Sequence, residues 1–142
     1  MLIAILEDDE RRLDVMESTL DELGLAHRAV FFDGALQMIA WLEENFARVS
    51  IVSLNHAARA TRVRELQPVS PGTGHDVVEW LAARPPAFPV LLHSGDARAR
   101  DAMQAALQKA GWTAEAIAPV ADLLWIQKYW IRRVRELFGP GA

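Results

Sequence analysis

The chain has 142 residues, a formal net charge of −4 and no cysteine. The lack of cysteine excludes disulfides and thiolate metal sites, and the negative net charge gives no overall field that would attract nucleic acid. Its 51% hydrophobic and 24% charged residues are ordinary for a globular protein, so we expect one domain over residues 1–142. Because it has no basic leader and no apolar run near the roughly 18 residues of a membrane span, we expect a cytoplasmic protein with no membrane partner.

Apolar runs alternate with helical patterns in the first half of the chain. Residues 2–6 are an uninterrupted apolar run, typical of a strand buried on both faces of a parallel sheet. A helix follows with apolar residues at helical spacing, and Gly24 is placed to end it. Residues 27–32 predict a second strand, and Asp33 can cap a helix over residues 35–46.

The second half repeats this alternation after a long irregular segment. Residues 57–74 have no clear period, and such a long loop in a compact domain tends to be functional or disordered. The remaining predicted strands are 51–54, 89–92 and 115–118. The remaining predicted helices are one from about 75 to 83, one that carries Met103, Ala106, Leu107 and Ala110 on one side and ends at Gly111, and a last one with Val120, Leu123, Leu124, Ile131, Val134 and Phe138 inward.

Five strand–helix repeats predict a doubly wound α/β fold with a five-stranded parallel sheet in flavodoxin-like order, 2-1-3-4-5. In such folds, ligands bind beyond the carboxyl ends of the strands, where the strand order switches. This rule selects Asp8, Asp9, Asn55 and His56 after the first and third strands, with His93 and Ser94 beside them.

The first strand is followed by four carboxylates, at residues 7–10. Adjacent carboxylates repel one another and therefore favour a hard cation such as Mg²⁺, which takes oxygen ligands. The alternative is helix capping, because acidic residues also suit the first turn of the helix that follows.

His56 and His93 each follow the end of a predicted central strand. They could face each other across a gap of phosphate size and act as general base and general acid in phosphoester cleavage. The alternative is that both are ordinary polar residues that satisfy backbone groups.

Ser94, Gly95 and Asp96 open a helix directly after the fourth strand. The unpaired N–H groups there suit an anion, and the Ser94 hydroxyl could add a further donor. The alternative is simple capping by Ser94 or Asp96. Three loop arginines could close over an anionic ligand, namely Arg59, Arg62 and Arg64.

Trp125 and Tyr129 are four residues apart on the last predicted helix and would share one face. This face could hold a partner helix or form a homodimer through the last helices. Packing under the long loop is the alternative.

These residues resemble the bacterial response-regulator receiver. The segment "IAILEDDE" looks like its opening, where an acidic pair binds Mg²⁺; the resemblance places that role on Asp8 and Asp9. The segment "IVSLNH" resembles the strand that ends in the phosphoacceptor aspartate, here replaced by Asn55, and "VLLHS" places Ser94 at the conserved hydroxyl position. The lysine expected after the fifth strand has no counterpart in "AIAPVAD".

A closer resemblance is to receiver-like domains thought to process cyclic phosphates. Their pattern is similar to "SLNH", "TGHDVVEWL" and "HSGDARARDAM" in this chain, with Met103 in the expected place. The two aspartates that flank the histidine in that family are replaced here by Asn55 and Ala57.

The leading hypothesis is a divergent receiver-like domain that binds a phosphate-bearing small molecule or RNA end and processes a cyclic phosphate. His56 and His93 would transfer protons, Ser94, Gly95 and Asn55 would hold the phosphate, and Asp8 and Asp9 would hold Mg²⁺. The alternative is a phosphorylation-independent interaction module that binds a signalling protein. The sequence shows no DNA-binding region.

Overall fold

A computed structural model describes residues 1–57, 61–63, 67–69, 72–120 and 122–139, with only the backbone described at 61–63 and 67–69. Its centre is a five-stranded parallel sheet in the order β2-β1-β3-β6-β7. The strands are β1 (Leu2–Leu6), β2 (Ala29–Phe32), β3 (Val49–Leu54), β6 (Val90–Leu92) and β7 (Ala114–Ala116). The predicted order, 2-1-3-4-5, is therefore confirmed.

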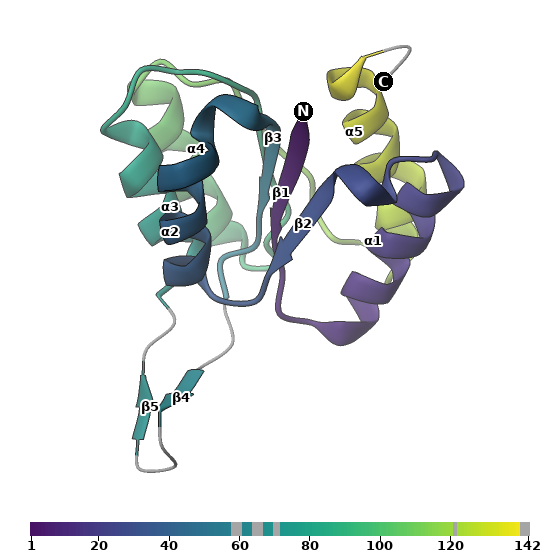
Figure 1. The fold of residues 1–142 in the computed structure, drawn as a ribbon, viewed down its shortest axis with the longest axis horizontal. Helices are drawn as coiled ribbons and strands as arrows, with labels where there is room; N and C mark the ends of the chain where they lie inside the picture. The colour runs from purple at the N-terminus through teal and green to yellow at the C-terminus, as the bar shows by residue number, and fades with distance from the viewer. Residues whose placement is uncertain (58–60, 64–66, 70–71, 121, 140–142) are drawn as a thin grey trace.

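Helices cover both faces of this sheet, and Figure 1 shows them as two groups on either side of the strands. One group consists of α2 (Ala35–Asn45), α3 (Gly74–Ala82) and α4 (Ala97–Lys109). The other consists of α1 (Glu10–Glu22), the π-helix η3 (Ile126–Trp130) and α5 (Ile131–Phe138). Short 3-10 turns, η1 (Ala26–Arg28) and η2 (Phe46–Arg48), lead into β2 and β3.

The irregular segment predicted after the third strand contains two short antiparallel strands, β4 (Thr61–Val63) and β5 (Gln67–Val69). Figure 1 shows them projecting from the end of the molecule where the central strands finish. Of the loop arginines, Arg59 and Arg64 lie outside the described residues, as does the side chain of Arg62. The prediction that they close over a ligand therefore stays a prediction.

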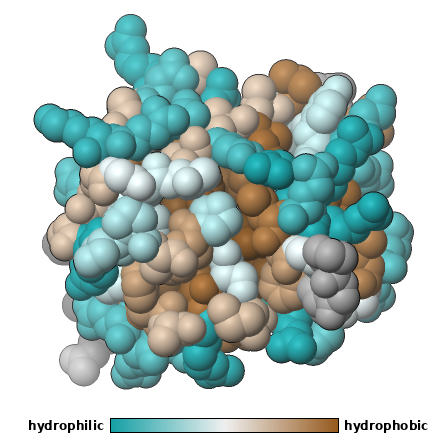
Figure 2. All heavy atoms as spheres, turned by 90° about the horizontal axis from the view of Figure 1, so that it is seen from above, coloured by the Kyte–Doolittle hydropathy of each residue, from teal (hydrophilic) through white to brown (hydrophobic). Residues whose placement is uncertain are grey.

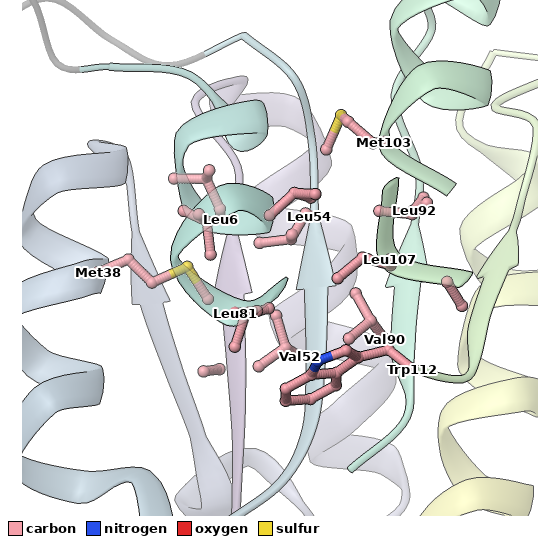
Figure 3. Packing of buried hydrophobic residues seen from close by; sticks show 14 of the residues in the cluster. Leu6, Met38, Val52, Leu54, Leu81, Val90, Leu92, Met103, Leu107 and Trp112 are labelled. Carbon is pink, nitrogen blue, oxygen red and sulfur yellow. The ribbon is translucent and has the colours of Figure 1, made fainter. Parts of the chain in front are cut away.

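The face under α2, α3 and α4 is packed with apolar side chains (Figure 3). Leu6, Leu54 and Leu92 extend from neighbouring strands toward Leu81 of α3 and Leu107 of α4. Each of these five side chains is fully buried. Burial of a leucine of this kind contributes about 1.5–3 kcal/mol to folding, so this face is a large source of stability.

The opposite face is closed by two fully buried tryptophans, Trp125 and Trp130. The predicted Trp125–Tyr129 face is wrong, because Trp125 is fully buried while Tyr129 is 53% exposed. Trp125 and Trp130, at the two ends of the π-helical stretch, are the pair that points inward, because both are fully buried. The predicted inward positions of Val120 and Leu124 are also wrong: both lie before η3 and are exposed.

The amino ends of the strands form the opposite end of the molecule. Viewed from that end, Figure 2 shows apolar atoms in the middle of the surface with hydrophilic side chains around them. Within the described part of the chain, none of the helices has the length and apolar character that a bilayer crossing requires.

Candidate functional site

Alternation along the strands brings buried polar residues together at the carboxyl end of the sheet. Glu7, Ser53 and His93 continue the inward rows that begin with Ile5, Ile51 and Leu91, on the face covered by α1 and η3. All three polar side chains are fully buried. A buried polar group destabilises the fold unless it has polar partners, so each of these three side chains requires them.

The Glu7 carboxylate is held by the backbone and by the side chains of His93 and Arg12. Its Oε2 accepts hydrogen bonds from the backbone N–H groups of Asp8 and Asp9, at 2.9 and 3.0 Å. Its Oε1 lies 3.2 Å from Nε2 of His93 and accepts from Nη1 of Arg12 at 3.4 Å. Burial raises the pKa of Glu7, but the contact with His93, the Asp9 N–H and Arg12 outweigh it and hold the pKa below its ordinary value.

His93 has both ring nitrogens directed at protein groups. Nδ1 lies 2.7 Å from the hydroxyl of Ser53, which also accepts a hydrogen bond from Nε1 of Trp130 at 3.0 Å. A hydroxyl can accept from an indole and donate to an imidazole at once, which leaves the Nε2 proton to face Glu7. The ring also stacks on Trp125, at 5.8 Å between centroids.

We call this series the buried polar chain; its members are Arg12, Glu7, His93, Ser53 and Trp130. It excludes the predicted arrangement in which His93 faces His56 across a ligand, because His93 has no exposed surface and neither nitrogen points to solvent. His56 is half-buried and follows Leu54, whose side chain belongs to the opposite face of the sheet. His75 is paired with Glu79 at 3.4 Å on α3.

Asn55, at the end of β3, donates to oxygens of the chain itself. Its Nδ2 lies 3.3 Å from Oε2 of Glu7, 3.3 Å from Oδ1 of Asp8 and 3.4 Å from the carbonyl oxygen of Ala57. The side chain is 5% exposed. The amide N–H₂ group predicted to bind phosphate is therefore directed at carboxylates.

Two other predicted site residues cap helices. Asp9 is exposed and its Oδ1 accepts the N–H of Arg12, which makes it the N-cap of α1. The Ser94 hydroxyl is 2% exposed and accepts the N–H of Asp96, which in turn caps α4 through Ala99. Only Asp8 of the predicted Mg²⁺ pair thus lies beside Asn55.

Two guanidinium groups meet at the turn between β6 and α4, where Gly95 is exposed. Arg100 donates through Nη1 to the carbonyl oxygen of Ser94 at 2.7 Å. Arg12 lies over the Trp125 ring at 5.6 Å, and its Nη2 is 3.8 Å from where a Cβ would stand at Gly95. Arg12 was not among the predicted site residues, although the third residue after an N-cap lies one turn from the strand end and can reach back over it.

The resemblance motif "TGHD" has a structural role here. Thr73 and Asp76 form a capping box at the start of α3. A Cβ on Gly74 would stand 2.0 Å from the carbonyl oxygen of Asn55 and 2.8 Å from Cε of Met103. Only glycine allows α3 to approach β3 this closely, and Met103 packs against it from α4. These residues fix the backbone around Asn55.

The side chains at the predicted Mg²⁺ site do not fit a cation in this arrangement. Asp9 caps a helix, and the point surrounded by oxygens of Glu7, Asp8 and Ala57 is taken by an N–H₂ group, which is a donor. Across the residues that the structure describes, no group of three or more His, Cys, Asp or Glu side chains is arranged to hold a metal ion.

Comparison of the structure with solved structures finds receiver domains that superpose on nearly the whole chain. The response-regulator receiver domain from Rhodospirillum rubrum is 17% identical, with a TM-score of 0.63 over 97% of this chain and 92% of its own. A CheY-like receiver domain protein from Methanospirillum hungatei JF-1 is 16% identical, with a TM-score of 0.62 over 97% and 98%. The Mn²⁺-bound form of response regulator Rcp1 is 13% identical, with a TM-score of 0.62 over 94% and 96%.

The chain therefore has the fold of a receiver domain, as the resemblance predicted. No protein-family model and no curated protein matches the sequence. Because the structural matches are 13–17% identical, they establish the fold, and activity has to be argued from the site itself.

Proposed function

We propose that this receiver-like domain binds a phosphate-bearing ligand at the carboxyl end of the sheet, at the Ser94–Gly95 turn beside Arg12 and Arg100. The observation that carries the proposal is the meeting of two guanidinium groups at the Ser94–Gly95 turn. A guanidinium has five N–H donors in a fixed fork, so one contact to the protein leaves donors for an anion.

The charges around this end of the sheet support an anion more than a cation. Glu7 is compensated by His93 and Arg12, and the Asp8 carboxylate accepts from Asn55. An asparagine at position 55 also carries one negative charge fewer than the aspartate of a phosphoacceptor site. Because an amide cannot form an acyl phosphate, we propose no phosphoryl transfer to position 55. Mg²⁺ binding by Asp8 and Asp9 is not part of the proposal.

Binding is the core of the proposal, and processing of a cyclic phosphate is its more specific form. Of the two predicted histidines, His56 alone has an exposed part, so it is the group that would accept a proton from an attacking water. The water oxygen would bond to phosphorus as one ring P–O bond breaks, and the proton taken up by His56 would pass to the leaving sugar oxygen. The Arg12 and Arg100 guanidiniums would hold the phosphate oxygens and stabilise the charge that develops on them.

The test of binding is a calorimetric titration of 2′,3′-cyclic AMP into the wild type and into Arg100→Gln. We expect Arg100→Gln to weaken binding at least tenfold, because it removes a charged donor. Arg98→Gln is the matched control, since Arg98 is an exposed residue of the same helix, and its affinity should stay unchanged. Equal loss in both variants, or equal affinity in all three proteins, would contradict a site at the Ser94–Gly95 turn.

The test of processing is hydrolysis of the same cyclic nucleotide by the wild type and by His56→Ala. Turnover that disappears in His56→Ala while binding persists would support His56 as the proton acceptor. Binding without turnover in the wild type would restrict the function to ligand recognition.

A second candidate is a phosphorylation-independent interaction module that binds a signalling protein or a second copy of the chain. Its support is an exposed apolar surface beside β7, where Val120, Leu124 and Tyr129 are 53%, 47% and 53% exposed. A groove lined partly by Val120 and Tyr129 runs next to it. Sedimentation of the wild type and of Tyr129→Glu tests the homodimer: a dimer that becomes monomeric would support it, and a wild-type monomer at all concentrations would refute it.

A further inference from the structure

We propose that the Asn55 side-chain amide takes the place of a cation, so that the acidic strand-end site is complete without a divalent metal ion. Three oxygens from two separate strand ends surround one nitrogen: Glu7 Oε2, Asp8 Oδ1 and the Ala57 carbonyl, at 3.3, 3.3 and 3.4 Å from Nδ2. All three neighbours are acceptors, which assigns the nitrogen and not the oxygen of the amide to this point. The inference does not depend on phosphate binding.

The distances indicate attraction shared among three acceptors. Each is longer than the roughly 2.9–3.0 Å of an ordinary N–H···O hydrogen bond, and an amide has two protons for the three oxygens. The N–H₂ group therefore acts on the carboxylates mainly through its positive end. A bound cation would also reduce the repulsion between the two carboxylates. The amide does so with a smaller positive charge and without having to lose a hydration shell.

The backbone of Asn55 is fixed on both sides, and its side chain is buried. The Asn55 N–H donates to the carbonyl oxygen of Leu6 at 3.0 Å, which joins β3 to β1. On the other side, Gly74 packs against the Asn55 carbonyl and its N–H donates to the carbonyl of His56 at 2.8 Å. With only 5% of the residue exposed, a metal ion would have to displace the buried amide to reach Glu7.

A single substitution should convert this arrangement into a metal site. Asn55→Asp replaces the donor by a third carboxylate, so that only oxygen atoms surround the centre. Oxygen-only sets of this kind suit Mg²⁺ and Mn²⁺. The same change adds a buried negative charge beside Glu7 and Asp8, so the variant should be less stable without metal and should recover when metal binds.

The experiment is a titration of Mn²⁺ followed by the electron paramagnetic resonance signal of the free ion, with thermal unfolding measured in parallel. The wild type should bind no Mn²⁺ up to millimolar concentrations, and its melting temperature should not change. Asn55→Asp should bind at least tenfold more tightly than the wild type and should gain thermal stability with Mn²⁺. Asp9→Asn is the control, because asparagine also caps helices, and it should behave as the wild type does.

Two results would overturn the inference. The first is millimolar or tighter Mn²⁺ binding by the wild type that Asp8→Asn abolishes. The second is a folded Asn55→Asp protein that binds Mn²⁺ no better than the wild type. If Asn55→Asp fails to fold even with Mn²⁺, Asn55→Ser decides: removal of the amide without added charge should let Mn²⁺ bind more tightly than to the wild type, and no change would refute the inference.

Discussion

The two faces of the sheet are built on different principles. Under α2, α3 and α4 the residues of the buried cluster are apolar. Under α1 and η3 the same strands carry Ile5, Ile51 and Leu91 for most of their length and then end in the buried polar chain. The first face supplies stability. The second face has buried polar residues in place of some apolar ones, and these hold a charged carboxylate in a fixed position next to the candidate site.

This difference predicts which substitutions each face tolerates. An apolar face tolerates exchanges of similar volume, since its contacts have no direction. The buried polar chain does not, because its contacts depend on direction and the loss of one member removes a polar contact from a buried neighbour. The strongest experiments on this molecule therefore compare substitutions on the two faces.

The largest effect should come from breaking the contact between Glu7 and His93 on the polar face. We expect His93→Leu to lower the free energy of unfolding by about 3–5 kcal/mol, because the buried Glu7 carboxylate loses its His93 contact and the Ser53 hydroxyl loses its imidazole partner. Urea unfolding followed by tryptophan fluorescence measures this loss. The double variant Glu7→Met, His93→Leu should lose less than His93→Leu alone, since no buried charge remains. Additive losses would mean that the pair is not coupled.

On the apolar face, Leu81→Ala should cost about 2–5 kcal/mol through lost burial and the cavity it leaves. Combined with His93→Leu it should give additive losses, because the two side chains lie on opposite faces of the sheet. A coupling energy above about 0.5 kcal/mol in the same urea experiment would contradict the independence of the faces.

Ser53 joins two members of the polar chain, and its loss should be intermediate. We expect Ser53→Ala to cost about 1–3 kcal/mol, because Trp130 Nε1 and His93 Nδ1 both lose a buried partner. Ser50→Ala is the control on the same strand, where the residue is half-buried, and should cost less. Equal costs would show that the Ser53 hydroxyl does not hold the chain together.

Acid should weaken the contacts of Glu7 on the polar face. The pKa of Glu7 is lower in the folded protein than its ordinary value, so the stability it contributes is complete above the ordinary glutamate pKa and is lost as pH falls through the folded value. Glu7→Gln should be less stable than the wild type at neutral pH, and this gap should narrow as pH falls through that range. A gap that stays constant from neutral to acid pH would argue against the lowered pKa.

The sequence was sufficient for the architecture because apolar runs and helix signals repeat in order. Leu2–Leu6 and Val90–Leu92 are buried strands where continuous apolar runs predicted them. The boundaries of the last helix could not be predicted, because nothing in a single sequence announces the π-turn that moves Trp130 inward and Tyr129 outward.

The location of the candidate site was predicted, but only some of the residues that form it were. The strand-end rule led to Asn55, His56 and His93. Strand alternation, carried one residue further, would have assigned His93 to the row of Leu91 and His56 to that of Leu54, on opposite faces. The contact between His93 and Glu7 could not be predicted, because it depends on how the ends of β1 and β6 are placed on either side of β3.

The most direct test of this account is calorimetric titration of the wild type with 2′,3′-cyclic AMP, once in EDTA and once in millimolar MgCl₂. The account predicts binding with the same affinity in both, because arginines hold the phosphate and the Asn55 amide stands where a cation would. Binding that requires Mg²⁺, or no binding in either buffer, would contradict it.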